Sequence, residues 1–167
     1  MRLLITGGSG FVGTALVARL RLTHDVIAPT RAEVDLLGNC ESTFDPLGTI
    51  DAVVHCAASR DRARPEPDRW PLETAINVMA TARLLEWCRS RGVRRFVHIS
   101  TISVLQTNTD LETVLDEESS MVTPPTHPYA LTKLWAEQLA IQQRSSFDSI
   151  DILRLGHVLG PHRLPRE

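Results

Sequence analysis

The sequence predicts an α/β domain with a doubly wound parallel sheet. Short apolar runs typical of buried strands alternate with longer segments of helical apolar spacing, and the first run ends in a glycine cluster. The chain has 167 residues, of which 43% are hydrophobic and 23% charged, which suits one globular core. We therefore expect a single domain over residues 1–167, with its ligand crevice at the carboxyl ends of the strands.

The first elements are expected to form a strand, a turn and a helix. Residues 2–6 are a β-type run that ends in glycines, and residues 11–22 follow with apolar side chains at helical spacing. A second strand is expected over residues 26–29, where Pro29 ends it because proline cannot donate to a ladder. A weak third strand is expected at Val34 and Asp35.

The remaining elements continue the alternation. Three more strands and two helices are expected. The first of these helices is long, and its apolar face includes Ile76 and Met79. In chain order these are strand 51–58, helix 72–91, strand 95–100, helix 128–144 and strand 150–155. Residues 106–128 are acidic and proline-rich, which indicates a surface loop, or alternatively a lid or substrate-side segment.

The composition excludes several function classes. The 18 basic and 20 acidic residues give a formal net charge of −2, and neither sign forms a stripe, so nucleic acid is not an expected partner. No apolar run approaches the roughly 18 residues of a membrane span, and no signal peptide precedes the first strand, so we expect a cytoplasmic protein. The three cysteines and six histidines show no metal-ligand spacing, so no metal site is expected.

A glycine turn between the first strand and the first helix is a candidate phosphate site. Glycines stand at positions 7, 10 and 13, with Phe11 and Val12 opening the helix. A pyrophosphate must approach main-chain N–H groups closely, which glycine permits because it lacks a Cβ, and a helix N-terminus supplies partial positive charge. The alternative is a tight turn without a ligand.

The pattern Gly-x-x-Gly-x-x-Gly resembles that of the extended short-chain dehydrogenases/reductases, the NAD(P)-dependent epimerase/dehydratase family. The resemblance continues along the chain. It includes Asp51-Ala-Val-Val-His-Cys-Ala-Ala58, Asn77 with Thr81, Arg95-Phe-Val-His-Ile-Ser-Thr101, Tyr129-Ala-Leu-Thr-Lys133, and Leu153-Arg-Leu with Gly160-Pro161. It implies a Rossmann fold in which Ala57, Ala58 and Asn77 contact a nicotinamide dinucleotide.

The residues at the end of the second strand predict which nicotinamide cofactor is bound. An acidic residue there accepts hydrogen bonds from a ribose 2′-hydroxyl and repels a 2′-phosphate. By register with the family, Thr30 stands where NAD-preferring members carry Asp, and Arg31 offers donors suited to phosphate. We therefore expect NADP rather than NAD, unless Arg31 is only surface charge. Asp35 and Leu36 resemble the Asp-hydrophobic pair that lies beside the adenine in this family. The short connection between the second and third strands resembles that of the dehydrorhamnose-reductase branch.

The only tyrosine and the only lysine, Tyr129 and Lys133, are four residues apart. On a helix that Pro128 can start, both side chains lie on one face. A phenol titrates near 10, and a nearby ammonium favours phenolate, so the pair can exchange a proton with a substrate oxygen. The resemblance also implies that Lys133 binds the nicotinamide ribose. The alternative is a buried tyrosine and a solvated lysine.

The resemblance aligns Thr101 with the hydroxyl that hydrogen-bonds the reacting oxygen, with Ser100 as the fallback. The usual Val-Tyr-Gly that follows is here Val104-Leu105-Gln106, and Ser103 is expected to be a packing residue.

Two functions are therefore open. The first is an NAD(P)-dependent oxidoreductase or epimerase/dehydratase that acts on a secondary alcohol or ketone, such as that of a nucleotide sugar, with Thr101, Tyr129 and Lys133 as its catalytic residues. The second is a non-catalytic, NADP-binding regulatory module. Family members usually continue more than a hundred residues past Gly160-Pro161, so we expect a fragment or truncated member with most of its substrate domain missing. A homodimer is a further possibility.

Overall fold

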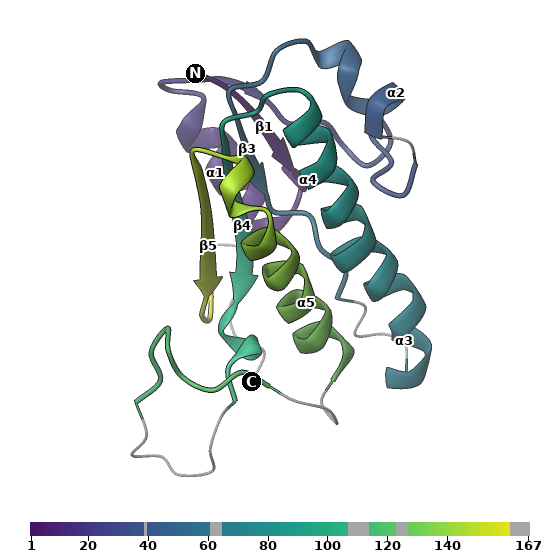
Figure 1. Ribbon diagram of the computed structural model, residues 1–167, viewed down its shortest axis with the longest axis vertical. Coiled ribbons are helices and arrows are strands. Elements are labelled where there is room, and N and C mark those ends of the chain that lie inside the picture. Colours follow the sequence, from purple (N-terminus) through teal and green to yellow (C-terminus); the bar gives the residue numbers. More distant parts are fainter. Residues whose placement is uncertain (39, 61–64, 107–113, 123–126, 161–167) are drawn as a thin grey trace.

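A computed structural model of the chain describes residues 1–38, 40–60, 65–106, 114–122 and 127–160. Within these residues the strands form one parallel sheet in the order β2-β1-β3-β4-β5 (Figure 1). The strands are β1 (Arg2–Thr6), β2 (Asp25–Ile27), β3 (Ala52–His55), β4 (Arg95–Thr101) and β5 (Ser149–Leu155). The order reverses direction between β1 and β3, which confirms the predicted doubly wound sheet and places its crevice at their carboxyl ends.

The helices cover both faces of the sheet. They are α1 (Phe11–Leu20), α2 (Cys40–Phe44), α3 (Glu66–Glu73), α4 (Ala80–Ser90) and α5 (Pro128–Gln142). Helix α1 connects β1 to β2, which lies on one side of β1. Helices α4 and α5 connect β3 to β4 and β4 to β5, so the chain there adds strands on the other side of β1. Right-handed crossovers therefore place α1 on one face and α4 with α5 on the other, as Figure 1 shows. No helix in the described residues is long and apolar enough to cross a bilayer.

The expected third strand does not form. The N–H groups of Glu33 and Val34 donate to the carbonyl of Thr30 at 3.1 and 3.0 Å, and Asp35 accepts from the N–H of Leu37 at 3.0 Å. These local bonds close a turn, so the backbone is not free to pair with a neighbouring strand.

The expected helix over residues 72–91 also differs from the structure. The helical segment begins earlier, at Glu66, and a π-helical turn over Thr74–Met79 separates α3 from α4. A π turn holds one more residue than an α turn and rotates the helix face that follows. Met79, expected on the apolar face, lies in this turn and is 49% exposed.

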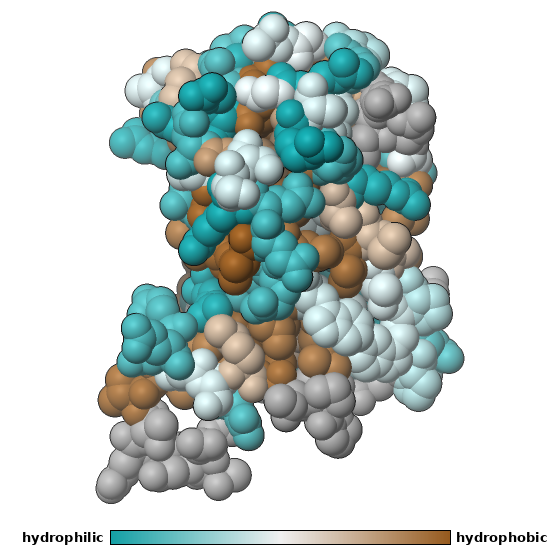
Figure 2. Space-filling model, viewed as in Figure 1, coloured by the Kyte–Doolittle hydropathy of each residue, from teal (hydrophilic) through white to brown (hydrophobic). Residues whose placement is uncertain are grey.

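The main core lies between the sheet and the α4–α5 layer. Strand side chains such as Leu4, Val53 and Phe96 pack there against Leu84 and Leu85. A smaller cluster lies near the carboxyl ends of the strands and consists of Val104, Leu105 and Leu134, with Leu115, Met121 and Val122 packed against it. Apolar side chains gather in the lower middle of the face drawn in Figure 2, at the level where the strands end.

A backbone contact joins the turn after β1 to the loop after β3. Gly7 has a φ of +69°, and a β-carbon there would lie only 2.6 Å from the amide nitrogen of Ala57. Gly92, after α4, has nearly the same φ of +70° but no neighbouring atom within 4 Å of its β-carbon position. The two glycines therefore share one backbone conformation but differ in packing.

We expect Gly7→Ala to destabilise the fold more than Gly92→Ala. The left-handed backbone costs each alanine about 1–2 kcal/mol, and Gly7→Ala must in addition displace the Ala57 backbone. Urea unfolding of both variants beside the native chain measures the two losses. Equal losses would show that the contact with Ala57 adds nothing to stability.

Candidate functional site

A cavity of about 260 Å³ opens at the carboxyl ends of β1, β2 and β3. It collects side chains and backbone from three loops that are distant in the sequence. Eight residues expected at the cofactor line it, namely Gly7, Gly10, Thr30, Arg31, Asp35, Leu36, Ala57 and Ala58. Phe11, Val12 and Gly13 are not among the lining residues and form the first turn of α1.

The glycines of the turn differ in what the fold requires of them. A β-carbon at Gly13 would lie 2.2 Å from the carbonyl oxygen of Gly7, so only glycine lets α1 pack against the turn. Gly10 is exposed, has a φ of −74°, and its β-carbon would meet only the Gly7 carbonyl, at 3.2 Å. Gly10 also caps the N-terminus of α1, where the helix dipole favours an anion. Its missing side chain therefore leaves space for a ligand.

An unexpected carboxylate, that of Glu33, lies in the turn that follows β2. The N–H and the hydroxyl of Thr30 both donate to Oε2 of Glu33, at 2.7 and 2.8 Å. The backbone bond and then the hydroxyl bond hold the pKa of Glu33 below its usual value. The spacing Thr-x-x-Glu, typical of a capping box, is the sequence signal that could have identified this pair.

Asn77 supports the loop after β3 from inside the π-helical turn. It is 1% exposed, accepts from the N–H of Ser59 at 2.7 Å, and donates to the carbonyl of Ser59 at 2.9 Å and the hydroxyl of Thr132 at 3.0 Å. Both amide hydrogens of Asn77 are thus used within the protein, which links this loop to α5. A direct contact between Asn77 and a cofactor stays a prediction.

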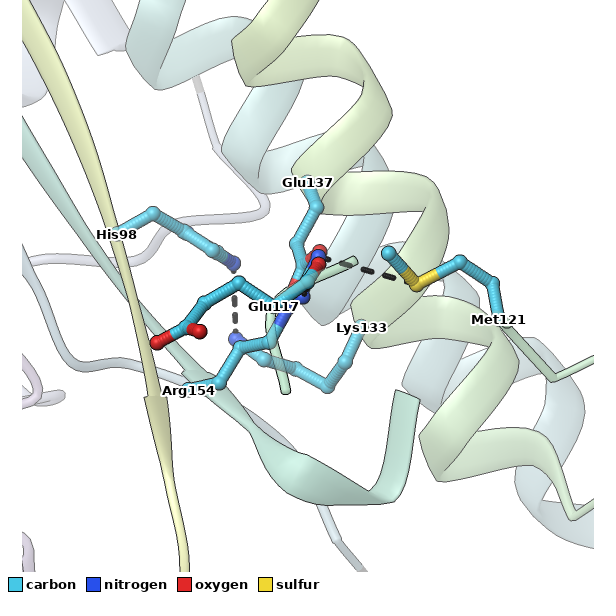
Figure 3. Close-up of polar contacts among 6 residues, drawn as sticks. All are labelled: His98, Glu117, Met121, Lys133, Glu137 and Arg154. Carbon is cyan, nitrogen blue, oxygen red and sulfur yellow. Dashed lines mark hydrogen bonds and ion pairs between the residues drawn. The ribbon is translucent and has the colours of Figure 1, made fainter. Parts of the chain in front are cut away.

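Lys133 is buried between α5 and β4, with 1% of its surface exposed. Its Nζ lies 3.1 Å from Nε2 of His98 (Figure 3). The same Nζ donates to the carbonyl of Ile99 at 2.7 Å. Burial lowers the pKa of Lys133 to about 8, against the opposing effects of Glu137 and Cys56. The alternative of a solvated lysine is therefore wrong.

His98 ends a row of polar side chains on the α5 face of the sheet. Thr6, His55 and His98 are neighbours in register across β1, β3 and β4. His55 is hydrogen-bonded through Nδ1 to Thr6 at 2.6 Å and through Nε2 to Thr81 at 2.9 Å. Burial, and then Lys133, lowers the pKa of His55 to about 3, and the same causes with His55 added lower that of His98 well below its usual value.

A buried ion pair lies beside Lys133 on α5. Glu137 is completely buried and accepts from Arg154 of β5, whose Nη2 lies 2.9 Å from Oε2. Arg154 also donates to the carbonyl of Glu117 at 3.1 Å and contacts the sulfur of Met121 at 3.8 Å (Figure 3). Sequence reasoning missed this pair, although the position of Glu137 four residues after Lys133 places both on one helix face.

The other proposed catalytic residues lie around the carboxyl end of β4. Tyr129 is half-buried in the first turn of α5, and the guanidinium of Arg60, from the loop after β3, lies 4.7 Å from its ring centroid. Thr101 ends β4, accepts from the N–H of Ser103 at 3.2 Å and donates to its hydroxyl at 3.2 Å. Ser103 is therefore a partner of Thr101 rather than a packing residue.

The cavity and the catalytic candidates are adjacent but separate. Thr101, Tyr129 and Lys133 are not among the residues that line the cavity. The loop after β3 connects them, because Ala57 and Ala58 line the cavity and Arg60 contacts Tyr129. Ser100, the fallback for Thr101, is 4% exposed, and its hydroxyl has no hydrogen-bond partner in the described residues. Those residues also contain no group of three or more potential metal ligands.

The chain is similar to known proteins along nearly its whole length. The profile of the NAD dependent epimerase/dehydratase family matches residues 3–167. The GDP-6-deoxy-D-mannose reductase of Pseudomonas aeruginosa is 35% identical over 84% of this chain and 46% of that protein. The UDP-glucose 4-epimerase of Vibrio cholerae is 31% identical over 95% of this chain and 52% of that protein. The chain thus spans about half the length of these relatives.

A solved structure shows the same likeness in three dimensions. MoeE5 in complex with UDP-glucose and NAD superposes with a TM-score of 0.76 at 30% identity, covering 99% of this chain and 57% of that one.

We expect stability to fall as the pH drops below about 6.5, and His55→Asn to reduce this dependence. The unfolded chain takes up a proton at His55 near pH 6.5, whereas the folded chain does so only near its pKa of about 3. Stability is thus lost between these two values, by up to about 1.4 kcal/mol per pH unit. Urea unfolding at pH 7, 6 and 5 measures the slope. An identical slope in His55→Asn would contradict this assignment.

Proposed function

Because the chain belongs to the NAD-dependent epimerase/dehydratase family, we propose that it supplies the dinucleotide site and the acid–base residues of an enzyme acting on nucleotide sugars. The reaction would oxidise or reduce a secondary alcohol carbon of the sugar, in an epimerisation, a dehydration or a net reduction. The observation that carries this proposal is the position of Lys133 and Tyr129 on one helix beside a cavity lined by the glycine turn.

The residues of the cavity fit a dinucleotide. Gly10, where a side chain would fill exposed space, and the N-terminus of α1 would hold the pyrophosphate. Asp35 and Leu36 would lie at the adenosine end, and Ala57 with Ala58 at the start of the nicotinamide half. When bound, the cofactor accepts or donates a hydride.

The chain's own residues would then move the proton. Tyr129 would exchange it with the substrate oxygen, and the cations of Lys133 and Arg60 would favour its phenolate form. Thr101 would hydrogen-bond the same oxygen by exchanging its bond to Ser103. Burial of Lys133 keeps its charge in a region of low dielectric, where it acts more strongly on a neighbouring phenol than in water.

The alternative, a regulatory module that binds NADP without turnover, makes a different use of the same cavity. The separation between the cavity lining and Tyr129 favours it. The spacing of the only tyrosine and the only lysine opposes it, because a module that only binds a cofactor has no need of Tyr129 one helical turn before Lys133. A homodimer also stays a prediction.

Among cofactors we propose that NADP is preferred to NAD, through Arg31, and that Glu33 limits this preference. Arg31 lines the cavity, where its guanidinium suits a 2′-phosphate. The carboxylate of Glu33, however, already takes the two donors of Thr30 and repels a second anion there.

Arg31→Ala should therefore weaken NADPH binding roughly tenfold and leave NADH binding nearly unchanged. Glu33→Gln should act in the opposite direction and raise the affinity for NADPH relative to NADH. Fluorescence titration of the reduced cofactors measures both ratios. A native chain that binds the two with equal affinity, and in which neither variant changes the ratio, would exclude this proposal.

The proposed activity is tested with Tyr129→Phe. It should lower turnover of UDP-glucose, UDP-glucuronic acid or a GDP-deoxy sugar by about a hundredfold or more, with cofactor affinity unchanged, because the phenol serves the substrate. Gly10→Val is the matched variant, since it should lose cofactor binding with the fold intact. The comparison is made in whatever full-length form is active, where turnover that Tyr129→Phe leaves unchanged would contradict the catalytic assignment and favour the regulatory module.

A further inference from the structure

We propose that His98 is a positioning residue for Lys133, whose imidazole Nε2 and the carbonyl of Ile99 together hold the lysine side chain at the end of β4. The inference rests on the proposed function, in which Lys133 acts on Tyr129 and on the cofactor. It assigns a role to a buried histidine that the mechanism does not otherwise use.

The contacts of the Lys133 ammonium use two of its three hydrogen-bond donors. A lysine ammonium has three donors and no acceptor. Nζ lies 3.1 Å from His98 Nε2 and 2.7 Å from the oxygen of Ile99, so two of its three hydrogens are directed to β4. One donor then remains for a ligand or for the phenol. The Lys133 side chain is therefore held in place before any ligand arrives.

The contact with Lys133 fixes the tautomer of His98. Because the ammonium can only donate, Nε2 must carry the lone pair and Nδ1 the proton. His98 is completely buried, and its Nδ1 has no hydrogen-bond partner in the described residues. A buried N–H without an acceptor is destabilising, and an aromatic hydrocarbon side chain would avoid that cost. The bond from Nε2 to Lys133 is the gain that offsets it.

The groups around Lys133 leave His98 as its side-chain acceptor. On β3, His55 uses both nitrogens for Thr6 and Thr81, and its ring lies 5.6 Å from that of His98. Burial raises the pKa of Cys56 to about 11, despite Lys133, so this thiol stays neutral. On α5, Glu137 accepts three hydrogen bonds from Arg154 of β5. Figure 3 shows the dashed line that joins His98 to Lys133, and the Arg154 side chain extending to the carboxylate of Glu137.

Loss of the His98 acceptor should therefore change the charge of Lys133. With Ile99 as its remaining partner, the buried ammonium would be less stable relative to the neutral amine. The pKa of Lys133, which burial lowers to about 8 against the opposing effects of Glu137 and Cys56, should then fall further. A neutral amine cannot favour phenolate at Tyr129, so the alteration would reach the proposed chemistry.

The chain permits a direct measurement, because Lys133 is its only lysine. With ¹³C-labelled lysine, the protein gives one lysine side-chain signal, and its shift against pH gives the pKa of Lys133. His98→Leu should lower this pKa by about one unit or more. His98→Gln, whose side-chain carbonyl can accept, should restore most of the native value, and His24→Gln, at the opposite end of the sheet, should leave it unchanged.

A second measurement uses the native protein and does not depend on how the variants fold. The ¹⁵N shifts of His98 should show the tautomer protonated at Nδ1 below pH 8. The Nε2-protonated tautomer at pH 7, or an unchanged Lys133 pKa in folded His98→Leu, would overturn the inference. Titration with NADH separates it from the proposed function. Failure to bind any dinucleotide would exclude that function, whereas the Lys133 pKa and the His98 tautomer would still decide the role of His98.

Discussion

The burial of a single ammonium group, that of Lys133, is the constraint on which the site depends. A charge with 1% exposure is unfavourable unless polar groups surround it. The chain provides a backbone carbonyl from Ile99, a neutral imidazole from His98 and, one turn along α5, the carboxylate of Glu137. Because these groups belong to β4 and α5, their contacts fix α5 against the sheet and place Tyr129, one turn earlier, at the carboxyl edge.

A second close contact positions the loops that surround the cavity. Gly7 can approach Ala57 because it lacks a side chain, so the turn after β1 and the loop after β3 meet where the strand order reverses. From the π-helical turn, Asn77 then holds Ser59 through both the amide N–H and the carbonyl of that residue. The loop that lines the cavity at Ala57 also places Arg60 against Tyr129, so the cavity and the proposed catalytic residues lie at one edge of the sheet.

The ion pair of Glu137 and Arg154 connects this edge to the segment before α5. Arg154 donates to the buried carboxylate of Glu137. It also contacts the Glu117 carbonyl and the Met121 sulfur, which belong to the segment before α5. The backbone bridge between Leu105 and Met121 fixes the same segment to the end of β4. Residues 114–122 are therefore not simply a solvated loop. The predicted loop over residues 106–128 otherwise includes 107–113 and 123–126, which lie outside the described residues.

The sequence by itself determined the features that depend on local spacing. The glycine turn, the alternation of strands with helices, and the placement of Tyr129 and Lys133 on one helix face follow from positions a few residues apart. Only the tertiary structure decided what these residues meet. His98 contacts Lys133 across 35 residues, Arg154 on β5 contacts Glu137 on α5, and Arg60 in the loop after β3 contacts Tyr129 on α5. The physical reason is that sheet register and helix packing decide which polar side chains share a buried space, and neither is encoded in a local pattern.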